Sequence, residues 1–144
     1  MRYFEARSTI SATPEEVWPV LAAVDAWPSW DSGVVGVRGT AALGRKVTVE
    51  SAAAPGNKFP VKVTAFDAPR VLELTGGLPF GLFRGARTFT LTPAKGGSTL
   101  FVMREEYSGP LLERMWKSIP DLQASFQQFA DGLKQRVESN GGRK

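Results

Sequence analysis

The sequence of 144 residues contains no cysteine and no histidine. Without cysteine there is no disulfide, no thiol nucleophile and no thiolate metal ligand. Without histidine the commonest general base and the commonest transition-metal ligand are missing, which excludes a Ser-His-Asp triad and a His-ligated zinc site. We therefore expect no cofactor and no metal bound through side-chain nitrogen or sulfur. Any catalysis must use carboxylates, lysine, arginine, tyrosine or bound water.

Long hydrophobic runs are missing as well. A membrane-spanning helix needs roughly 20 apolar residues, and no run approaches that length. Charged residues such as Glu5, Arg7, Glu15 and Glu16 interrupt the first twenty residues, so a signal-peptide layout is absent. We expect a cytoplasmic protein without integral membrane association. The length, with 42% hydrophobic and 22% charged residues, predicts one globular domain over residues 1–144.

The net charge of +4 raises the question of a nucleic-acid partner. A protein that binds along the phosphate backbone of a nucleic acid needs a continuous row of basic residues on its surface. The basic residues here are dispersed along the chain and are interleaved with acidic residues. They cluster at most in pairs, such as Arg45-Lys46. We expect no nucleic-acid partner, and the chain is predicted to be a monomer or a homodimer.

Short segments of alternating apolar and polar residues predict strands. The first, residues 2–11, is followed by Thr13, which can cap a helix, and by Pro14, which suits its first position. A second short helix or a turn is expected over residues 25–31. Connections between the later strands are short, which is typical of antiparallel neighbours. These later strands are predicted over residues 33–38, 45–51, 58–66, 71–75, 85–92 and 99–107.

The C-terminal segment has apolar residues at steps of three and four, which predicts an amphipathic helix. Pro120 interrupts the pattern, so we expect a break there and a main helix from about Pro120 to Glu138. Such a helix has to cover a broad apolar surface, and a curved antiparallel sheet is what the chain offers. The predicted class is α+β: six to seven antiparallel strands curve around the helix, and two short helices follow the first strand. The apolar residues are Leu111, Met115, Ile119, Leu122, Phe126, Phe129, Leu133 and Val137.

Four segments resemble the START/SRPBCC superfamily, which includes polyketide cyclases/dehydrases, lipid-transport proteins and plant pathogenesis-related allergens. They are residues 10–18, 27–31 and 96–99 and the ending from Leu122 to Glu138. Their order and spacing carry the resemblance over nearly the whole chain. The resemblance implies a helix-grip fold with a cavity for lipids, polyketides or similar ligands. It implies no particular reaction, because the superfamily contains binders, transporters, cyclases and co-chaperones.

Trp27 and Trp30 are the first candidate ligand-binding residues. They lie three residues apart, so both side chains project from one side of a helical turn. They could line the mouth of a cavity, or they could fill the small end of the core, as large aromatic residues usually do. We favour the core for both, and for Trp27 more than for Trp30.

Residues 76–83 form an unusual segment, in which large apolar side chains alternate with glycines and a proline. Such a loop is poorly solvated unless it folds onto something. It could be a lid over a cavity entrance, with glycines as hinges, or a hairpin end packed against the long helix. As a lid, it would close against residues 27–30 and the start of the last helix. The side chains that would close are Leu78, Phe80 and Phe83.

The candidate ligand set is completed near the start of the last helix and on the sheet that faces it. Its members there are Met103, Met115, Trp116 and Ile119. Methionine adapts to varied ligand shapes, yet it also fills ordinary gaps in a core. We favour core packing for Met103, Met115 and Trp116.

Arg87 and Glu105 each interrupt a strand face that otherwise carries large apolar residues, such as Phe89 and Phe101. If those faces point inward, the two charges should pair with each other or with a polar ligand group. A bulge near residues 104–106 would instead turn them outward. We favour an exposed ion pair across the two strands, and we keep Arg87 and Glu105 as candidate ligand-binding and catalytic residues.

Three functions are compatible with these features. The leading one is binding or carriage of a small apolar molecule, lipid-like or polyketide-like, in an internal cavity. The second is a cyclase, aromatase or dehydratase that acts on a polyketide-like substrate, and the third is a protein-interaction domain of the co-chaperone kind. A featureless apolar cavity would favour the binder, and convergent arginine, glutamate and tyrosine side chains would favour the enzyme. A filled interior with an exposed apolar groove would favour the interaction domain.

Overall fold

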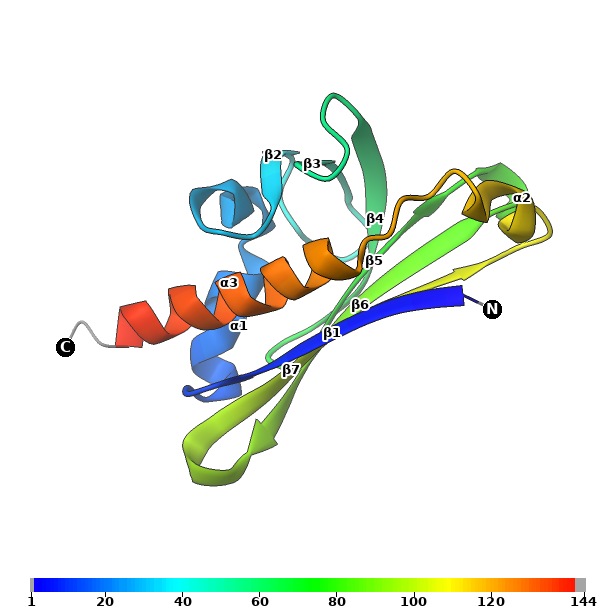
Figure 1. The fold of residues 1–144 in the computed structure, drawn as a ribbon. Helices are drawn as coiled ribbons and strands as arrows, with labels where there is room; N and C mark the ends of the chain where they lie inside the picture. The colour runs from blue at the N-terminus through cyan, green and yellow to red at the C-terminus, as the bar shows by residue number, and fades with distance from the viewer. Residues whose placement is uncertain (1, 142–144) are drawn as a thin grey trace.

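The computed structural model describes residues 2–141, in which a seven-stranded antiparallel sheet is the largest element (Figure 1). The strand order is β1-β7-β6-β5-β4-β3-β2, so the first and last strands are neighbours. This confirms the predicted class, and the later strands begin and end within two residues of their predicted limits. The strands are β1 (Arg2–Ile10), β2 (Val34–Arg38), β3 (Lys46–Ser51), β4 (Lys58–Asp67), β5 (Val71–Gly77), β6 (Arg84–Ala94) and β7 (Ser98–Ser108).

Two short helices connect β1 to β2: α1 (Pro14–Ala22) and the 3-10 helix η1 (Val24–Ser29). Thr13 begins α1 as predicted. The backbone nitrogen of Glu16 donates to Thr13 Oγ1 over 3.3 Å, and the backbone nitrogen of Thr13 donates to Glu16 Oε1 over 2.9 Å. Trp27 Nε1 donates to the Leu21 carbonyl over 2.9 Å, so a buried indole fastens η1 to α1.

The C-terminal part forms two helices, α2 (Leu112–Trp116) and α3 (Gln123–Gly141). The break predicted at Pro120 is confirmed, and α3 begins at Gln123, whose backbone nitrogen donates to Asp121 Oδ1 over 3.0 Å. The 3-10 helices η2 (Pro79–Gly81) and η3 (Lys95–Gly97) lie in the β5–β6 and β6–β7 connections. No helix within residues 2–141 is long and apolar enough to cross a membrane.

The long helix α3 crosses the inner face of the sheet, with α1 and η1 at one end and α2 at the other (Figure 1). Phe126, Phe129, Leu133 and Val137 are at most 3% exposed, so the predicted apolar face of α3 is in the core. Leu122, predicted on the same face, precedes the helix and is half-buried.

Polar side chains of α3 cover the free edge of β1. Backbone groups at a sheet edge can otherwise pair with another chain. Here, three donors along one side of the helix reach the β1 carbonyls over 2.7–3.2 Å. They are Gln123 to Glu5, Gln127 to Arg7 and Lys134 to Thr9.

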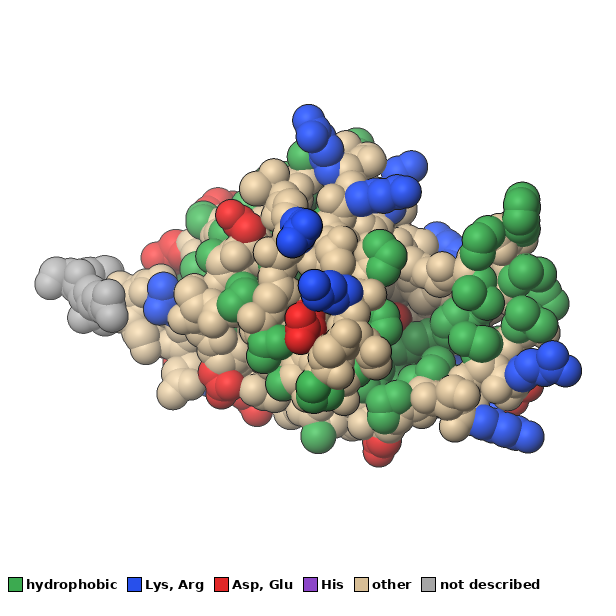
Figure 2. All heavy atoms as spheres, turned by 90° about the horizontal axis from the view of Figure 1, so that it is seen from above, with side chains coloured by type: hydrophobic (Ala, Val, Ile, Leu, Met, Phe, Trp, Pro, Cys, Tyr) green, Lys and Arg blue, Asp and Glu red, His purple; other side chains and the backbone are tan. Residues whose placement is uncertain are grey.

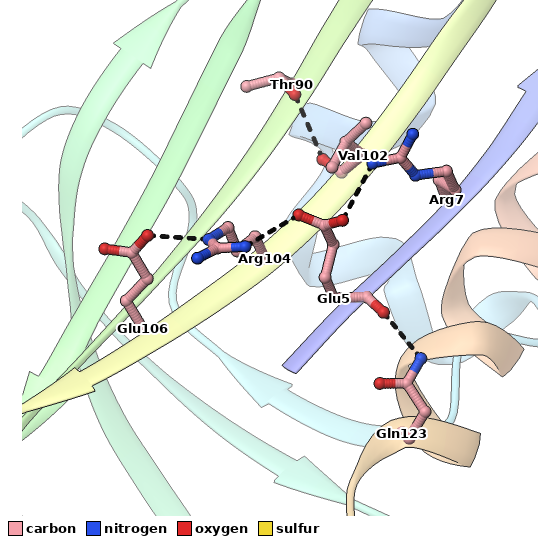
Figure 3. Close-up of polar contacts among 7 residues, drawn as sticks. All are labelled: Glu5, Arg7, Thr90, Val102, Arg104, Glu106 and Gln123. Carbon is pink, nitrogen blue, oxygen red and sulfur yellow. Dashed lines mark hydrogen bonds and ion pairs between the residues drawn. The ribbon is translucent and has the colours of Figure 1, made fainter. Parts of the chain in front are cut away.

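The outer face of β1 and β7 carries a chain of ion pairs (Figure 3). Glu5 accepts from Arg7 over 2.9 Å and from Arg104 over 3.1 Å, and Arg104 also donates to Glu106 over 2.8 Å. The two arginines hold the pKa of Glu5 below its usual value. The two arginines and two glutamates therefore neutralise one another on the outer face.

Candidate functional site

One half of the inner face is filled by large side chains. Trp27 packs against Phe129 and Phe89, with ring centroids 4.9 and 5.5 Å apart, and Phe101 stacks on Phe89 at 6.3 Å. Trp27 and Met103, both candidates for ligand contact, are 1% exposed. In this structure they are part of the protein core.

The other half of the inner face is open. Figure 2 shows the surface hollowed between the start of α3 and the end of the molecule that carries α2, with hydrophobic side chains on the floor and the far wall. On the α2 side, Phe4 stacks on Trp116 at 5.4 Å, and Phe83 stacks on Tyr107 at 6.1 Å. Trp116 also meets the edge of Tyr107 at 5.4 Å. These rings form an aromatic cluster at the α2 end of the sheet, and such a cluster suits a flat apolar guest.

Arg87 and Glu105 lie directly opposite each other on β6 and β7, and both face inward. Arg87 Nε donates to Glu105 Oε1 over 2.5 Å, and its guanidinium carbon lies 4.6 Å from the centre of the Phe126 ring. The ion pair across the two strands that we favoured from the sequence is present, but its exposed position is wrong, because the side chains are only 30% and 15% exposed. The reason is that β6 and β7 pair from Arg84 to Ala94 without a register shift, which keeps Glu105 on the same face as Met103.

Gly85 provides the space for the Glu105 carboxylate. A Cβ atom at this position would lie 2.7 Å from Glu105 Oε2 and 3.4 Å from the Tyr107 ring. A larger residue at position 85 would push the carboxylate away from Arg87.

Tyr107 is the polar residue that the sequence analysis missed. It is 4% exposed, and its hydroxyl is buried without a hydrogen-bond partner among residues 2–141. Burial raises the pKa of this phenol well above its usual value, the Glu105 charge adds to the rise, and Arg87 acts against it. The hydroxyl therefore keeps its proton beside Arg87 and Glu105, and it can act as a hydrogen-bond donor. Its position two residues after Glu105 on one strand was the available signal.

The remaining candidates divide between the two ends of the sheet. Met115, Trp116 and Ile119 are half-buried at the α2 end, where the Leu111 nitrogen donates to the Leu82 carbonyl over 2.9 Å. Trp30 lies on α3 at the opposite end, 5.1 Å from the Phe129 ring, and its buried Nε1 also lacks a partner within residues 2–141.

The lid geometry expected from the sequence is only half present. The segment of residues 78–83 touches the α2 region, but the segment of residues 27–30 lies at the far end of the sheet (Figure 1). Phe83 packs on Tyr107, whereas Phe80 is 99% exposed and Leu78 is 40% exposed. The three side chains therefore do not form one cover.

Two surface grooves lie away from this hollow. One, of about 610 Å³, lies between α1, the β6–β7 turn and the end of α3, and its lining includes Glu16, Gly97 and Glu138. The other, of about 360 Å³, lies on β2, β3 and β4, and its lining includes Arg38, Glu50 and Lys58. Both are lined by residues outside the candidate set, and both mix polar and apolar groups.

Residues 1–138 match the model of a protein family described as polyketide cyclase/dehydrase and lipid transport. The chain belongs to this family. No curated protein matches its sequence. Solved structures with the same fold include the Zhui aromatase/cyclase from Streptomyces sp. R1128, with a TM-score of 0.75 and 14% identity over 97% of this chain and 95% of that one.

Two further structures show how widely the fold is used. A norcoclaurine synthase from Thalictrum, solved with a transition-state analogue, has a TM-score of 0.72 and 15% identity, covering 97% of this chain and 96% of its own. A START superfamily protein from Mycobacterium smegmatis has a TM-score of 0.70 and 14% identity, covering 96% and 98%. At this level of identity the likenesses concern the fold alone, and they confirm the predicted helix-grip fold.

For this member of the polyketide cyclase/dehydrase and lipid-transport family, the inner face offers three kinds of polar group. Arg87 supplies a positive charge and N–H donors, Glu105 supplies an acceptor, and Tyr107 supplies a neutral donor. Within residues 2–141, no three metal-ligating side chains come together. Arg87, Glu105 and Tyr107 can form hydrogen bonds and transfer protons.

Proposed function

We propose that this protein binds a small, largely apolar molecule, aromatic or polyketide-like, in the hollow between α2 and the start of α3. The guest presents one neutral carbonyl oxygen to Tyr107. The observation that supports this most is the buried Tyr107 hydroxyl, which lacks a partner within residues 2–141. A buried hydroxyl without a partner is costly, and a ligand oxygen would remove that cost.

The charge of the site favours a neutral ligand group over an ion. Arg87 and Glu105 already neutralise each other across 2.5 Å. Because the pair has no net charge, an ionic guest would lose its hydration without a compensating charge, whereas a ketone only needs the Tyr107 proton. The aromatic side chains of Phe4, Phe83 and Trp116 then contact the apolar body of the guest.

A matched pair of dyes tests this proposal. One is a dimethylaminonaphthalene that carries a propionyl ketone, and the other is the same naphthalene without the ketone. We expect the protein to bind both dyes. Tyr107→Phe should weaken the affinity for the ketone dye by roughly five-fold, since one neutral hydrogen bond contributes about 1 kcal/mol. Binding of the dye without the ketone should not change, and fluorescence titration measures both.

Stability provides the control for the same variant. Because Tyr107→Phe removes a buried hydroxyl that has no partner in residues 2–141, the free energy of unfolding should not fall. Equal weakening of both dyes would show that Tyr107 acts as part of the wall. Unchanged binding of both dyes would refute the carbonyl anchor.

A second candidate function, a polyketide cyclase or dehydratase activity, is favoured by the convergence of Arg87, Glu105 and Tyr107. The Glu105 carboxylate would take a proton from a CH₂ group between two carbonyls of a poly-β-ketone. The enolate would attack a second carbonyl carbon of the same molecule and form a C–C bond. Tyr107 would protonate the new alkoxide and regain its proton from Glu105, and loss of water would follow.

The enzyme candidate is tested with a short poly-β-keto thioester, by following the absorbance of an aromatic product. We expect Glu105→Gln to abolish turnover while the variant still binds the dye without the ketone. Turnover by Glu105→Gln at the original rate would exclude Glu105 as the base. Absence of turnover by the unmodified protein, with ketone-dye binding intact, would leave the binding function in place.

A further inference from the structure

An apolar projection at one end of the molecule carries three exposed side chains, Leu78, Phe80 and Leu82, that the proposed site does not use. We call residues 77–83 the β5–β6 tip. Phe80, at its apex, is 99% exposed, and Leu78 and Leu82 are 40% and 39% exposed. Large apolar side chains gathered at one projecting point are unusual on a protein surface and mark an interaction site. Figure 2 shows hydrophobic side chains gathered over this end of the molecule, with Lys or Arg side chains beside them.

The β5–β6 tip is held outward by backbone hydrogen bonds. The Leu78 nitrogen donates to the Phe83 carbonyl over 2.9 Å, and the Leu82 nitrogen to the Pro79 carbonyl over 3.3 Å. The Leu111 nitrogen fastens the tip to the α2 region by donating to the Leu82 carbonyl over 2.9 Å. Phe80 itself has a φ of 63°, a conformation that residues with a side chain rarely adopt. The fold thus presents Phe80 to the surroundings at the expense of backbone strain.

The charges around the tip are mostly positive. Residues 77–84 and 109–121 contain Arg84, Arg114 and Lys117 against Glu113 and Asp121, and Arg2 pairs with Glu113 over 2.7 Å. The excess is two positive charges, four basic residues minus two acidic ones. Arg84, Arg114 and Lys117 are exposed, and none of them forms an ion pair with a residue in the range 2–141.

We propose that the β5–β6 tip docks on anionic lipid bilayers, with Phe80 and Leu82 inserted among the headgroups and the cations on the lipid phosphates. Exposed aromatic and aliphatic side chains ringed by Lys and Arg match this interface. A second copy of the chain fits less well. In a symmetric dimer through the tip, the positive rims of Arg84, Arg114 and Lys117 would face each other. The tip adjoins α2, so docking also brings the hollow next to the membrane, where apolar guests dissolve.

The experiment is co-sedimentation with vesicles of phosphatidylcholine alone or with added phosphatidylserine, with no other ligand present. We expect binding to the phosphatidylserine vesicles, and a loss of about ten-fold or more in Phe80→Asn. Asparagine suits the positive φ, and Phe80 is exposed, so the melting temperature should not fall. Leu43→Asn is the matched control, because Leu43 is 67% exposed in the β2–β3 turn, and it should bind like the unmodified protein. The triple variant Arg84→Gln/Arg114→Gln/Lys117→Gln should lose the preference for phosphatidylserine.

Three outcomes would overturn the proposal. The first is no sedimentation of the unmodified protein with either vesicle, and the second is undiminished binding of Phe80→Asn. The third is a dimer in solution that Phe80→Asn dissociates, because a second copy would then occupy the tip. The dye titrations are independent of this test, so either proposal can fail while the other stands.

Discussion

Gly132 lets α3 pack directly against the backbone ahead of β2. A Cβ atom at this position would lie 1.8 Å from the Asp31 carbonyl oxygen. In an exposed helix, alanine in place of glycine stabilises by about 1 kcal/mol. Here the contact decides the sign, and we expect Gly132→Ala to lower the free energy of unfolding by about 2 kcal/mol or more. Urea denaturation measures this loss.

A glycine without close neighbours is the control. At Gly36 on β2, the atom nearest to an added Cβ is Glu50 Oε1 at 3.8 Å. Gly36→Ala should change the free energy of unfolding by less than about 0.5 kcal/mol. If Gly132→Ala behaved in the same way, α3 could not be packed as closely as the structure has it.

Phe126 joins the core to the polar groups of the site. It is 1% exposed, and the Arg87 guanidinium lies over its ring. Phe126→Ala should lower the free energy of unfolding by about 3–5 kcal/mol, because removal of the buried ring leaves a cavity in the core. Thermal or urea unfolding gives the value, and a loss below about 1 kcal/mol would contradict the burial of this side chain.

At the scale of elements, α3 serves both as a core helix and as the cover of an edge strand. Its apolar face contacts the sheet, while Gln123 and Gln127 donate to the backbone of β1. We expect Gln123→Ala/Gln127→Ala to lower the free energy of unfolding by about 1–2 kcal/mol in total. The uncovered edge should also promote aggregation, which light scattering detects. Gln135→Ala, at an exposed position on the same helix, should do neither.

The last turns of α3 fasten the end of β1 through Glu138. Lys134 Nζ lies 2.7 Å from Glu138 Oε2, and the Ser11 backbone nitrogen donates to the same oxygen over 2.9 Å. Lys134 first, and then the Ser11 N–H, hold the pKa of Glu138 below its usual value. The stabilisation is thus present above the unfolded-state pKa, about 4.3, and is lost as the pH falls through the lower folded-state pKa.

We expect Glu138→Gln to be less acid-sensitive than the unmodified protein. The difference should be about 0.5 kcal/mol between pH 6 and pH 3, since the pair is partly exposed and screened by solvent. Urea midpoints across this range measure it. An identical pH profile for the two proteins would show that the ion pair does not stabilise the folded state.

At the scale of the whole molecule, stability should not depend on a metal. The sequence has no histidine or cysteine, and no three metal-ligating side chains come together within residues 2–141. We expect dialysis against a chelator to leave the melting temperature unchanged. Stoichiometric zinc that survives dialysis against plain buffer would contradict this, and it would require a site made of oxygen ligands.

Local signals in the sequence were sufficient for the strands, α1 and α3 of this protein. Alternation predicted the strands, Thr13 and Pro14 predicted the start of α1, and Pro120 predicted the break before α3. Each of these signals acts between residues close in the chain, through backbone geometry, capping or side-chain period. The number and order of the elements then left an antiparallel sheet under one long helix as the arrangement that buries their apolar faces.

The site depended on tertiary structure. Whether Arg87 and Glu105 face inward depends on the unbroken register of β6 and β7, and a single bulge would have reversed it. Two features depend on where α3 begins and which half of the sheet it covers. One is the Tyr107 hydroxyl, which has no partner in the described range 2–141, and the other is the separation of Trp30 from the β5–β6 tip. These are contacts between residues far apart in the chain. The sequence therefore determined the elements, and packing decided which polar groups meet in the hollow.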